Sequence, residues 1–275
     1  MQADLIYDVG LHKGEDTAFY LKRGFKVIGI EANPDLVQHC QTRFRHELAS
    51  GQLQIIKGAI AAASEGPEIT FFKNSDSVLG TIDKSRAEKA ADLGHKSESI
   101  VVPRLDAADV FRLHGVPYFL KVDVEGVDQL VLEGLKVQAD RPQYISVESD
   151  KLDFDRLEAD LKLLRELGYR KFRAVQQQRI PGSVVRTKTL DGKVIDYTFE
   201  TGASGSFGED LQIAWLDYDG IIRRYKAIFR DYRFFGDGTI LSKFPILALP
   251  FKAVYKACTG HRGSLPGWYD THACL

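Results

Sequence analysis

The fold of this chain is decided by one short stretch, Asp8-Val9-Gly10-Leu11-His12-Lys13-Gly14. An apolar run at residues 5–9 leads into it, and residues 16–21 after it have helical character. A strand, a tight glycine turn and a helix N-terminus in this order bring backbone N–H groups up to a ligand. The spacing Gly-x-x-x-Gly differs from the Gly-x-Gly-x-x-Gly of dinucleotide-binding turns. Two glycines also occur in such turns for steric reasons only, so a plain turn stays open as an alternative.

An acidic residue at the end of the second predicted strand favours a ligand site. Residues 25–30 are mostly apolar, and Glu31 follows them directly. In a doubly wound sheet, an acid at this point accepts hydrogen bonds from ribose hydroxyls, roughly 20 residues after the first glycines. The distance from Gly10 to Glu31 fits that spacing. We therefore favour ribose binding over the alternative of a solvated strand end.

Length and composition limit the classes of protein. The 275 residues suffice for one large α/β domain, or for a core with an extension, and the net charge of −1 disfavours a nucleic-acid partner held by phosphate neutralisation. Three cysteines without metal-ligand spacing indicate a reducing compartment. The chain enters a strand almost at once, and no apolar run reaches the roughly 20 residues of a membrane span. We expect a cytoplasmic protein without a signal peptide or membrane span.

Strands and helices alternate as far as residue 175, which predicts an α/β fold with a doubly wound, mostly parallel sheet. We expect a core at residues 1–175 and a C-terminal α+β extension at residues 176–275. The core strands are expected at residues 5–9, 25–30, 53–60, 118–124, 144–148 and 169–175, an extra strand pair at 68–73 and 99–104, and helices at 15–23, 34–49, 106–114, 127–135 and 155–167. In the extension we expect a hairpin at 184–189 and 193–199, a flexible Gly/Ser loop at 202–208, a return to the sheet at 211–215, a helix at 221–232, and a packed surface segment at 244–258.

Acidic residues gather at the expected carboxyl ends of the strands. Lys121, Asp123 and Glu125 alternate with valines, so strand periodicity places all three on one side. A buried central strand should be continuously apolar, and departures from such local rules concentrate at functional sites. The alternative is an ion pair between Lys121 and a glutamate that closes the end of the sheet. The predicted strand-end acids are Asp8, Glu31, Asp123, Glu125 and Glu148.

Several motifs resemble the FkbM family of class I S-adenosylmethionine-dependent methyltransferases, over residues 4–175. The resemblance is carried by Tyr7-Asp8-Val9-Gly10 with Gly14 and Thr17, by Ile28-Gly29-Ile30-Glu31-Ala32-Asn33-Pro34, and by Leu120-Lys121-Val122-Asp123-Val124-Glu125-Gly126 followed by Leu132-Glu133-Gly134-Leu135. The resemblance implies a Rossmann-like core that binds S-adenosylmethionine. The carboxylates gathered at the strand ends suit the cationic sulfonium and ammonium groups of S-adenosylmethionine better than the phosphates of NAD. The implied cofactor-binding residues are Asp8, Val9, Gly10, Leu11, Gly14, Thr17, Glu31, Ala32, Ala59 and Ile60.

The resemblance also implies roles for these residues. The backbone at residues 10–14 would cradle the methionine and ribose, Asp8 would hold the amino group, and Glu31 would take both ribose hydroxyls. Ala59 and Ile60 would border the adenine.

The family implies methyl transfer to a hydroxyl oxygen of a sugar, a glycan or a natural-product-like small molecule. Such an in-line displacement depends on alignment, and a positioned base helps the alcohol to attack. Asp123 is the first choice for this role and Glu125 the second. His12, in the cofactor turn, is a third candidate, with a solvated loop imidazole as its alternative. A divalent metal held by Asp123, Glu125 and Glu148 fits the preference of hard cations for oxygen, but the spacing does not demand one.

The extension is the expected source of a lid or substrate wall, with the 202–208 loop as a hinge. The aromatic tail with Trp268, Tyr269 and His272 either faces the acceptor or packs on the domain or at a contact between two copies in a homodimer. Two functional alternatives stay open: an NAD-type oxidoreductase, which the turn and the acidic crevice disfavour, and a non-catalytic protein that keeps the pocket as a relic.

Overall fold

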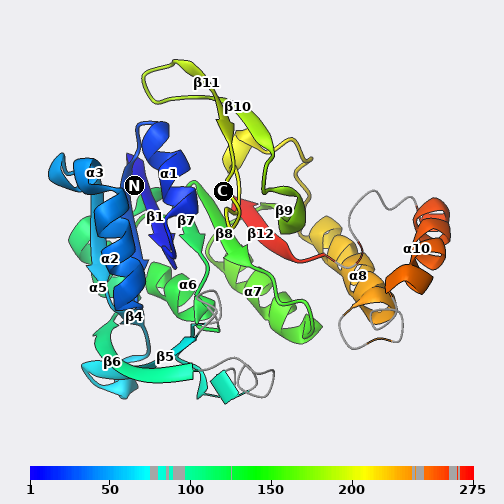
Figure 1. Ribbon diagram of the computed structural model, residues 1–275, viewed down its shortest axis with the longest axis horizontal. Helices are drawn as coiled ribbons and strands as arrows, with labels where there is room; N and C mark the ends of the chain where they lie inside the picture. The colour runs from blue at the N-terminus through cyan, green and yellow to red at the C-terminus, as the bar shows by residue number, and fades with distance from the viewer. Residues whose placement is uncertain are drawn as a thin grey trace.

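A seven-stranded sheet with helices on both faces forms the centre of the molecule (Figure 1). Its order is β3-β2-β1-β7-β8-β12-β9, and every neighbouring pair is parallel except the two that involve β12. This is the predicted α/β fold with a doubly wound, mostly parallel, Rossmann-like sheet. The computed structural model describes residues 1–74, 80–84, 87–88, 97–124, 126–236, 239, 245–259, 265 and 267–275.

The elements follow the predicted alternation closely. The strands of the large sheet are β1 Gln2–Val9, β2 Lys26–Glu31, β3 Leu53–Lys57, β7 Pro117–Val122, β8 Tyr144–Glu148, β9 Lys171–Gln176 and β12 Tyr269–Cys274. The helices are α1 Glu15–Lys22, α2 Pro34–Arg43, α3 Arg45–Ala49, α5 Ala107–His114, α6 Asp128–Lys136, α7 Phe154–Glu166, α8 Tyr218–Phe235 and α10 Pro245–Thr259. The predicted extra pair is β5 Glu68–Asn74 with β6 Ser97–Leu105, which β4 Ala59–Ile60 joins in a small sheet, and the predicted hairpin is β10 Val184–Lys188 with β11 Val194–Thr198.

Each face of the sheet buries its own apolar core. Side chains of α5, α6, α7 and α8 pack on one face. On the other face, α1 and α2 are joined by residues of the C-terminal part of the chain. Phe207 from that part stacks on Phe119 of β7, with ring centroids 4.1 Å apart. The two ends of the chain therefore share one core.

The C-terminal tail forms a strand inside the sheet. β12 lies antiparallel between β8 and β9, and Asp270 is paired in register with Glu148. Tyr269 and His272 are 5% and 3% exposed, whereas Trp268 is 43% exposed. Of the two predicted roles of the tail, packing on the domain is the observed one. The prediction of an acceptor-facing aromatic surface is wrong for Tyr269 and His272.

Two predicted elements of the core are each divided by a local backbone change. The helix expected at residues 34–49 breaks at Phe44, whose buried ring lies against Gly14. The strand expected at residues 53–60 breaks at Gly58, which has a φ of +148°. A Cβ there would come within 2.7 Å of the Pro103 carbonyl oxygen, so only glycine fits. Because the backbone changes direction at Gly58, β4 leaves the large sheet and pairs with β6.

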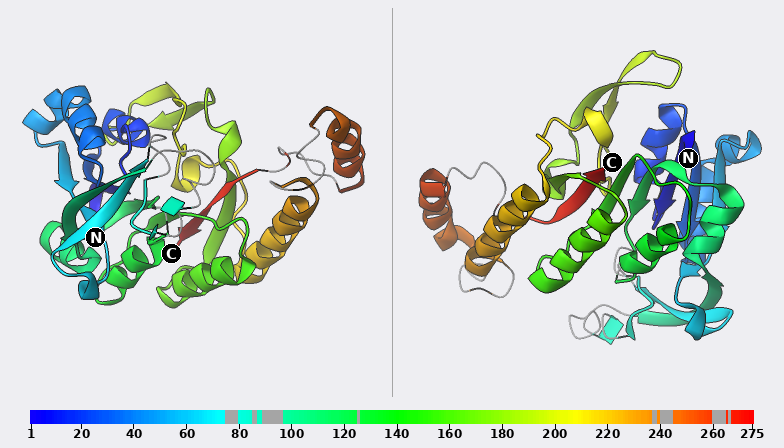
Figure 2. Two further views of the ribbon diagram at one scale, coloured as in Figure 1. Left: turned by 60° about the horizontal axis from the view of Figure 1, so that its bottom comes forward. Right: turned by 180° about the vertical axis from the view of Figure 1, so that it is seen from behind.

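The extension departs from prediction at two places. Residues 211–215 form no strand, and the return to the sheet is a single bridge between Leu216 and Phe172. The segment expected to pack on the surface forms the helix α10, with Pro250 inside it. In both Figure 1 and Figure 2, α10 projects from the end of α8, away from the sheet. Among the described helices, none is long and apolar enough to cross a bilayer.

A row of polar side chains crosses one face of the sheet. The register places Lys121 beside Asp8 and Ser146, and places His272 between Ser146 and Arg173. Both ring nitrogens of His272 are buried without a hydrogen-bond partner among the described residues. Burial, together with the nearby Arg173, lowers the pKa of His272 to about 3.

This pKa makes His272 a source of acid sensitivity. Between pH 6.5 and about 3 only the unfolded chain binds the proton, so stability is lost as the pH falls. We expect His272→Phe, which keeps a planar ring beside Phe119, to flatten the pH dependence by up to about 1.4 kcal/mol per pH unit in that window. Urea unfolding at a series of pH values measures this slope. Parallel curves for the two proteins would contradict the assignment.

Candidate functional site

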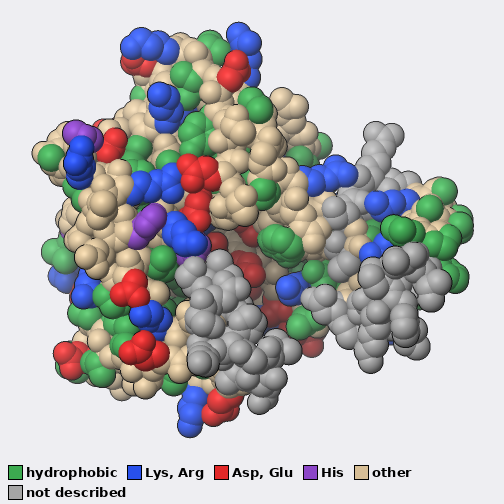
Figure 3. Space-filling model, in the orientation of Figure 1, with side chains coloured by type: hydrophobic (Ala, Val, Ile, Leu, Met, Phe, Trp, Pro, Cys, Tyr) green, Lys and Arg blue, Asp and Glu red, His purple; other side chains and the backbone are tan. Residues whose placement is uncertain are grey.

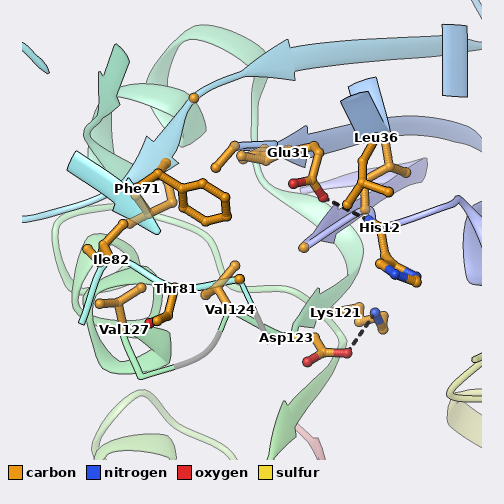
Figure 4. Close-up of a pocket in the computed structure, with 18 of the residues that line it drawn as sticks. His12, Glu31, Leu36, Phe71, Thr81, Ile82, Lys121, Asp123, Val124 and Val127 are labelled. Atoms are coloured by element: carbon orange, nitrogen blue, oxygen red, sulfur yellow. Dashed lines mark hydrogen bonds and ion pairs between the residues drawn. The ribbon is translucent and has the colours of Figure 1, made fainter. Parts of the chain in front are cut away.

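A pocket opens at the carboxyl ends of β1, β2 and β7 (Figure 4). This is where open α/β sheets bind ligands. Residues far apart in the sequence share it. It is lined by Gly10, Leu11, His12, Glu15, Asp16, Ile30, Glu31, Ala32, Leu36, Gly58, Ala59, Ile60, Phe71, Gly80, Thr81, Ile82, Lys121, Asp123, Val124, Val127 and Gly202.

The turn after β1 brings its backbone close to neighbouring strands. The N–H groups of Gly10 and Leu11 both donate to the Ile30 carbonyl at 3.0 Å. Gly10 has a φ of +91°, and a Cβ on it would lie 1.9 Å from the Asp123 carbonyl oxygen. Gly14 has a φ of +79° and faces the Phe44 ring. Both glycines are thus required sterically, and Gly10 additionally borders the pocket.

Glu31 ends β2 with its carboxylate at the pocket wall. Its two oxygens accept the backbone N–H groups of His12 at 2.9 Å and of Asn33 at 2.8 Å. Burial raises the pKa of Glu31, while these hydrogen bonds oppose the shift. The backbone donors fix the carboxylate toward the cavity, and each oxygen keeps a further lone pair for a ligand.

Lys121 holds three carboxylates at the base of the site. Its ammonium lies 3.4 Å from Asp8, 3.4 Å from Asp16 and 3.3 Å from Asp123. Lys121, Asp8 and Asp16 are almost fully buried. Burial raises the pKa of Asp8 to about 7, although Lys121 acts against the shift. The pKa of Asp16 is also raised by burial. The ion pair that was the structural alternative at the sheet end is therefore present, made with aspartates.

Asp123 is the member of this cluster that reaches solvent. It follows β7, its N–H donates to the Val9 carbonyl at 2.9 Å, and its side chain is 44% exposed. Figure 4 shows its carboxylate beside Lys121 at the charged end of the pocket. Glu125, the second predicted base, lies outside the described residues.

β12 brings one further acid to this edge. Asp270 pairs in register with Glu148. Burial, followed by the nearby Asp123, raises the pKa of Asp270 well above its usual value.

His12 occupies a left-handed backbone conformation, with a φ of +51°, that non-glycine residues seldom adopt. Its Nδ1 lies 3.0 Å from a Glu15 oxygen, and both residues line the pocket. Burial raises the pKa of Glu15, but hydrogen bonds from His12 and the backbone, together with nearby positive charge, lower it overall. A contact with Glu15 therefore replaces the solvated imidazole considered from the sequence.

The C-terminal part of the chain closes one side of the pocket. Gly202, in the predicted Gly/Ser loop, is part of the lining. The Asp16 carboxylate accepts the N–H groups of Ser204 at 2.8 Å and Gly205 at 3.2 Å. Arg43 of α2 contacts Glu200 at 2.6 Å just before the loop. These contacts hold the 202–208 loop against the core, where the loop forms one wall of the pocket.

The opposite end of the pocket is apolar. Figure 4 shows Phe71, Ile82, Val124 and Val127 grouped there, away from Glu31 and the charged residues. Phe71 comes from the small sheet that β4 joins, and its side chain is 7% exposed. A ligand with an apolar ring at one end and charges at the other fits this division.

The predicted site residues divide into two groups. Gly10, Leu11, Glu31, Ala32, Ala59, Ile60, His12 and Asp123 line the pocket. Behind it, Asp8 accepts a hydrogen bond from Thr17 at 2.7 Å, and Val9 and Gly14 pack in the core.

Several pocket residues were not assigned from the sequence. Phe71 lies in a strand that was predicted but not connected with the site. Glu15 and Asp16 lie in the first turn of α1, where acidic residues are favoured in any helix. The sequence therefore did not distinguish them as pocket residues. Apart from Lys121, which was weighed as an ion-pair residue, the lining residues not assigned from the sequence are Glu15, Asp16, Ile30, Leu36, Gly58, Phe71, Gly80, Thr81, Ile82, Val124, Val127 and Gly202. Within the described part of the chain, no group of three or more His, Cys, Asp or Glu is arranged to hold a metal ion.

Comparison with protein families decides the class. The methyltransferase FkbM domain matches residues 8–171, more than half of the 275-residue chain. The chain belongs to the FkbM methyltransferase family. This membership favours S-adenosylmethionine as the cofactor over the NAD of the oxidoreductase alternative. A search of curated proteins found no significant match.

Solved structures similar to this FkbM protein include other methyltransferases. The FkbM methyltransferase from Methylobacillus flagellatus KT is 15% identical, with a TM-score of 0.41 over 62% of this chain and 40% of that chain. A precorrin-6y C5,15-methyltransferase from Geobacter metallireducens GS-15 is 12% identical, with a TM-score of 0.34 over 72% and 77%. This chain thus spans two fifths of the FkbM structure it matches.

The close approach at Gly10 can be tested against a matched glycine. Gly51 also has a positive φ, but nothing lies within 4 Å of a Cβ there. We expect Gly51→Ala to lower the free energy of unfolding by about 1 kcal/mol for its backbone conformation alone. Gly10→Ala should lose about 2 kcal/mol more, because the methyl group overlaps Asp123. Urea unfolding measures both, and equal losses would contradict the steric requirement.

Proposed function

We propose that this FkbM-family protein transfers the methyl group of S-adenosylmethionine to a hydroxyl oxygen of a sugar, a glycan or a natural-product-like small molecule. The observation that carries the proposal is the position of Asp123. Its partly exposed carboxylate lies at the charged end of the pocket, 3.3 Å from Lys121. A carboxylate held in this way is suited to draw a proton from an alcohol as it attacks.

The residues of the pocket fit the cofactor. A Cβ at Gly10 would overlap the Asp123 carbonyl, so only glycine lets the backbone of the turn lie at this edge of the pocket. Glu31, already oriented by two backbone N–H groups, would accept the ribose hydroxyls. The apolar end with Ala59, Ile60 and Phe71 would receive the adenine. When bound, S-adenosylmethionine supplies an electrophilic methyl group on a cationic sulfonium.

The charged end would position the acceptor. Asp123 would accept the hydroxyl proton, and Lys121 would keep that carboxylate in place. The anchored wall at Gly202, with Glu15 and His12 beside it, would exclude water from the acceptor side. Polar groups at this end of the pocket suit a hydroxylated acceptor better than an extended apolar one. In this proposal the C-terminal part acts as the substrate wall.

Two substitutions separate the proposed roles. Glu31→Ala should weaken binding of S-adenosylmethionine by about 1.5–3 kcal/mol, since a charged hydrogen-bond acceptor is lost. Asp123→Asn should keep cofactor affinity within about twofold and lower turnover by about 100-fold or more, because the amide is no base. Calorimetry measures the affinity. Release of S-adenosylhomocysteine with a panel of sugars, glycans and hydroxylated natural products measures turnover.

Glu68→Ala is the matched control, because Glu68 is an exposed acid on β5 outside the pocket. It should change neither quantity. Unchanged cofactor affinity in Glu31→Ala would disprove the ribose assignment. Cofactor binding without turnover on any acceptor would instead favour the relic.

A further inference from the structure

The helix α10 presents an apolar face that no described residue covers. Leu249, Phe251 and Val254 are 63%, 61% and 64% exposed. Side chains spaced four apart lie on one side of a helix, and the exposed ones here form such rows. Figure 3 shows green side chains gathered on this projecting lobe. Within residues 249–258, the part of the helix whose side chains are described, the exposed residues are Leu249, Pro250, Phe251, Ala253, Val254, Ala257 and Cys258, none of them charged.

This arrangement is the reverse of an ordinary surface helix, which turns its polar side to water. The side of α10 that faces the protein holds Tyr255, whose hydroxyl donates to Asp231 at 2.6 Å. The Tyr255 ring also packs on Phe235, with centroids 5.0 Å apart. α10 is thus attached to the end of α8 by its polar and aromatic side. The contacts of Tyr255 thus orient α10 so that its apolar face points away from the protein.

The two helices of this region, α8 and α10, are rich in basic residues. α10 carries Lys252 and Lys256 and no acid, and both lysines are half-buried. α8 carries five basic and two acidic residues, and its basic side chains, Arg223, Arg224, Lys226, Arg230 and Arg233, are all exposed. The two helices therefore have a net charge of +5, although the whole chain has a net charge of −1. The remaining residues of the chain have a net charge of −6.

We propose that α10 and the basic side chains of α8 bind the surface of an anionic lipid bilayer. An amphipathic helix with a broad apolar face and flanking lysines lies in the headgroup region, with its apolar side turned to the acyl chains. Each basic residue near an anionic surface adds to the attraction. The protein would sit on one leaflet without crossing it, which agrees with the lack of a spanning helix among the described residues.

A second copy of the chain is a poorer occupant. A twofold contact brings the same patch of each copy together. Two copies would bury their apolar faces only by placing a net +5 against a net +5. An anionic bilayer satisfies both the apolar face and the charge.

Vesicle flotation of the full chain tests the proposal. We expect the protein to float at least tenfold more strongly with phosphatidylcholine vesicles containing about one third phosphatidylserine than with phosphatidylcholine alone. Molar salt should release most of it, because the charges are then screened. The triple variant L249E/F251E/V254E should bind at least tenfold more weakly than the wild type, and R233E/K256E should lose the preference for phosphatidylserine.

The matched control is V101E/L113E/L152E, which places the same charges at exposed apolar positions outside α10. It should float like the wild type. Absence of flotation with anionic vesicles would overturn the proposal, as would equal losses in the control and the α10 variant. Sedimentation equilibrium distinguishes self-association. A wild-type dimer that L249E/F251E/V254E abolishes, without vesicle binding, would also overturn it.

Discussion

The rest of the structure depends on one buried ammonium group. Lys121 lies within 3.4 Å of carboxylates from β1, α1 and the end of β7. Taking these charges out of water costs several kcal/mol per ion, and one cation cannot neutralise three anions. The imbalance is relieved in two ways. Burial raises the pKa values of Asp8 and Asp16, which favours their neutral forms, while Asp123 keeps its side chain partly in solvent. The partly exposed carboxylate of the cluster, that of Asp123, therefore lies at the pocket.

The same cluster joins the two ends of the chain. Asp16 contacts Lys121 and also accepts the backbone N–H groups of Ser204 and Gly205. The wall of the pocket is thus tied to the helix that follows the glycine turn. β12 completes this connection, because it fills the gap between β8 and β9 with residues from the C-terminus. The FkbM-family core and the C-terminal part consequently share one sheet and one pocket. A substitution at Lys121 is therefore expected to affect both parts.

The sequence predicts the core well because its signals are local. Glycines at positive φ, an acid at the end of β2 and alternating apolar runs each act within a few residues. The remainder depends on contacts between distant segments. Residues 269–274 contain Asp270, Thr271 and His272, and nothing local marks such a polar stretch as an inner strand. Phe71 reaches the pocket only because Gly58 turns β4 toward β6. The apolar segment expected at 244–258 had no helical prediction, and it forms a helix that contains Pro250.

The most direct measurement of the central claim is the stability of Lys121→Met. The side chain keeps its length and loses its charge, so three carboxylates remain without their cation. We expect a loss of about 3–5 kcal/mol in the free energy of unfolding near pH 8. The loss should be smaller near pH 5, where protonated carboxyls need no counter-charge, because stability tied to raised carboxyl pKa values falls as the pH rises. Unchanged stability at pH 8, or a loss independent of pH, would contradict it.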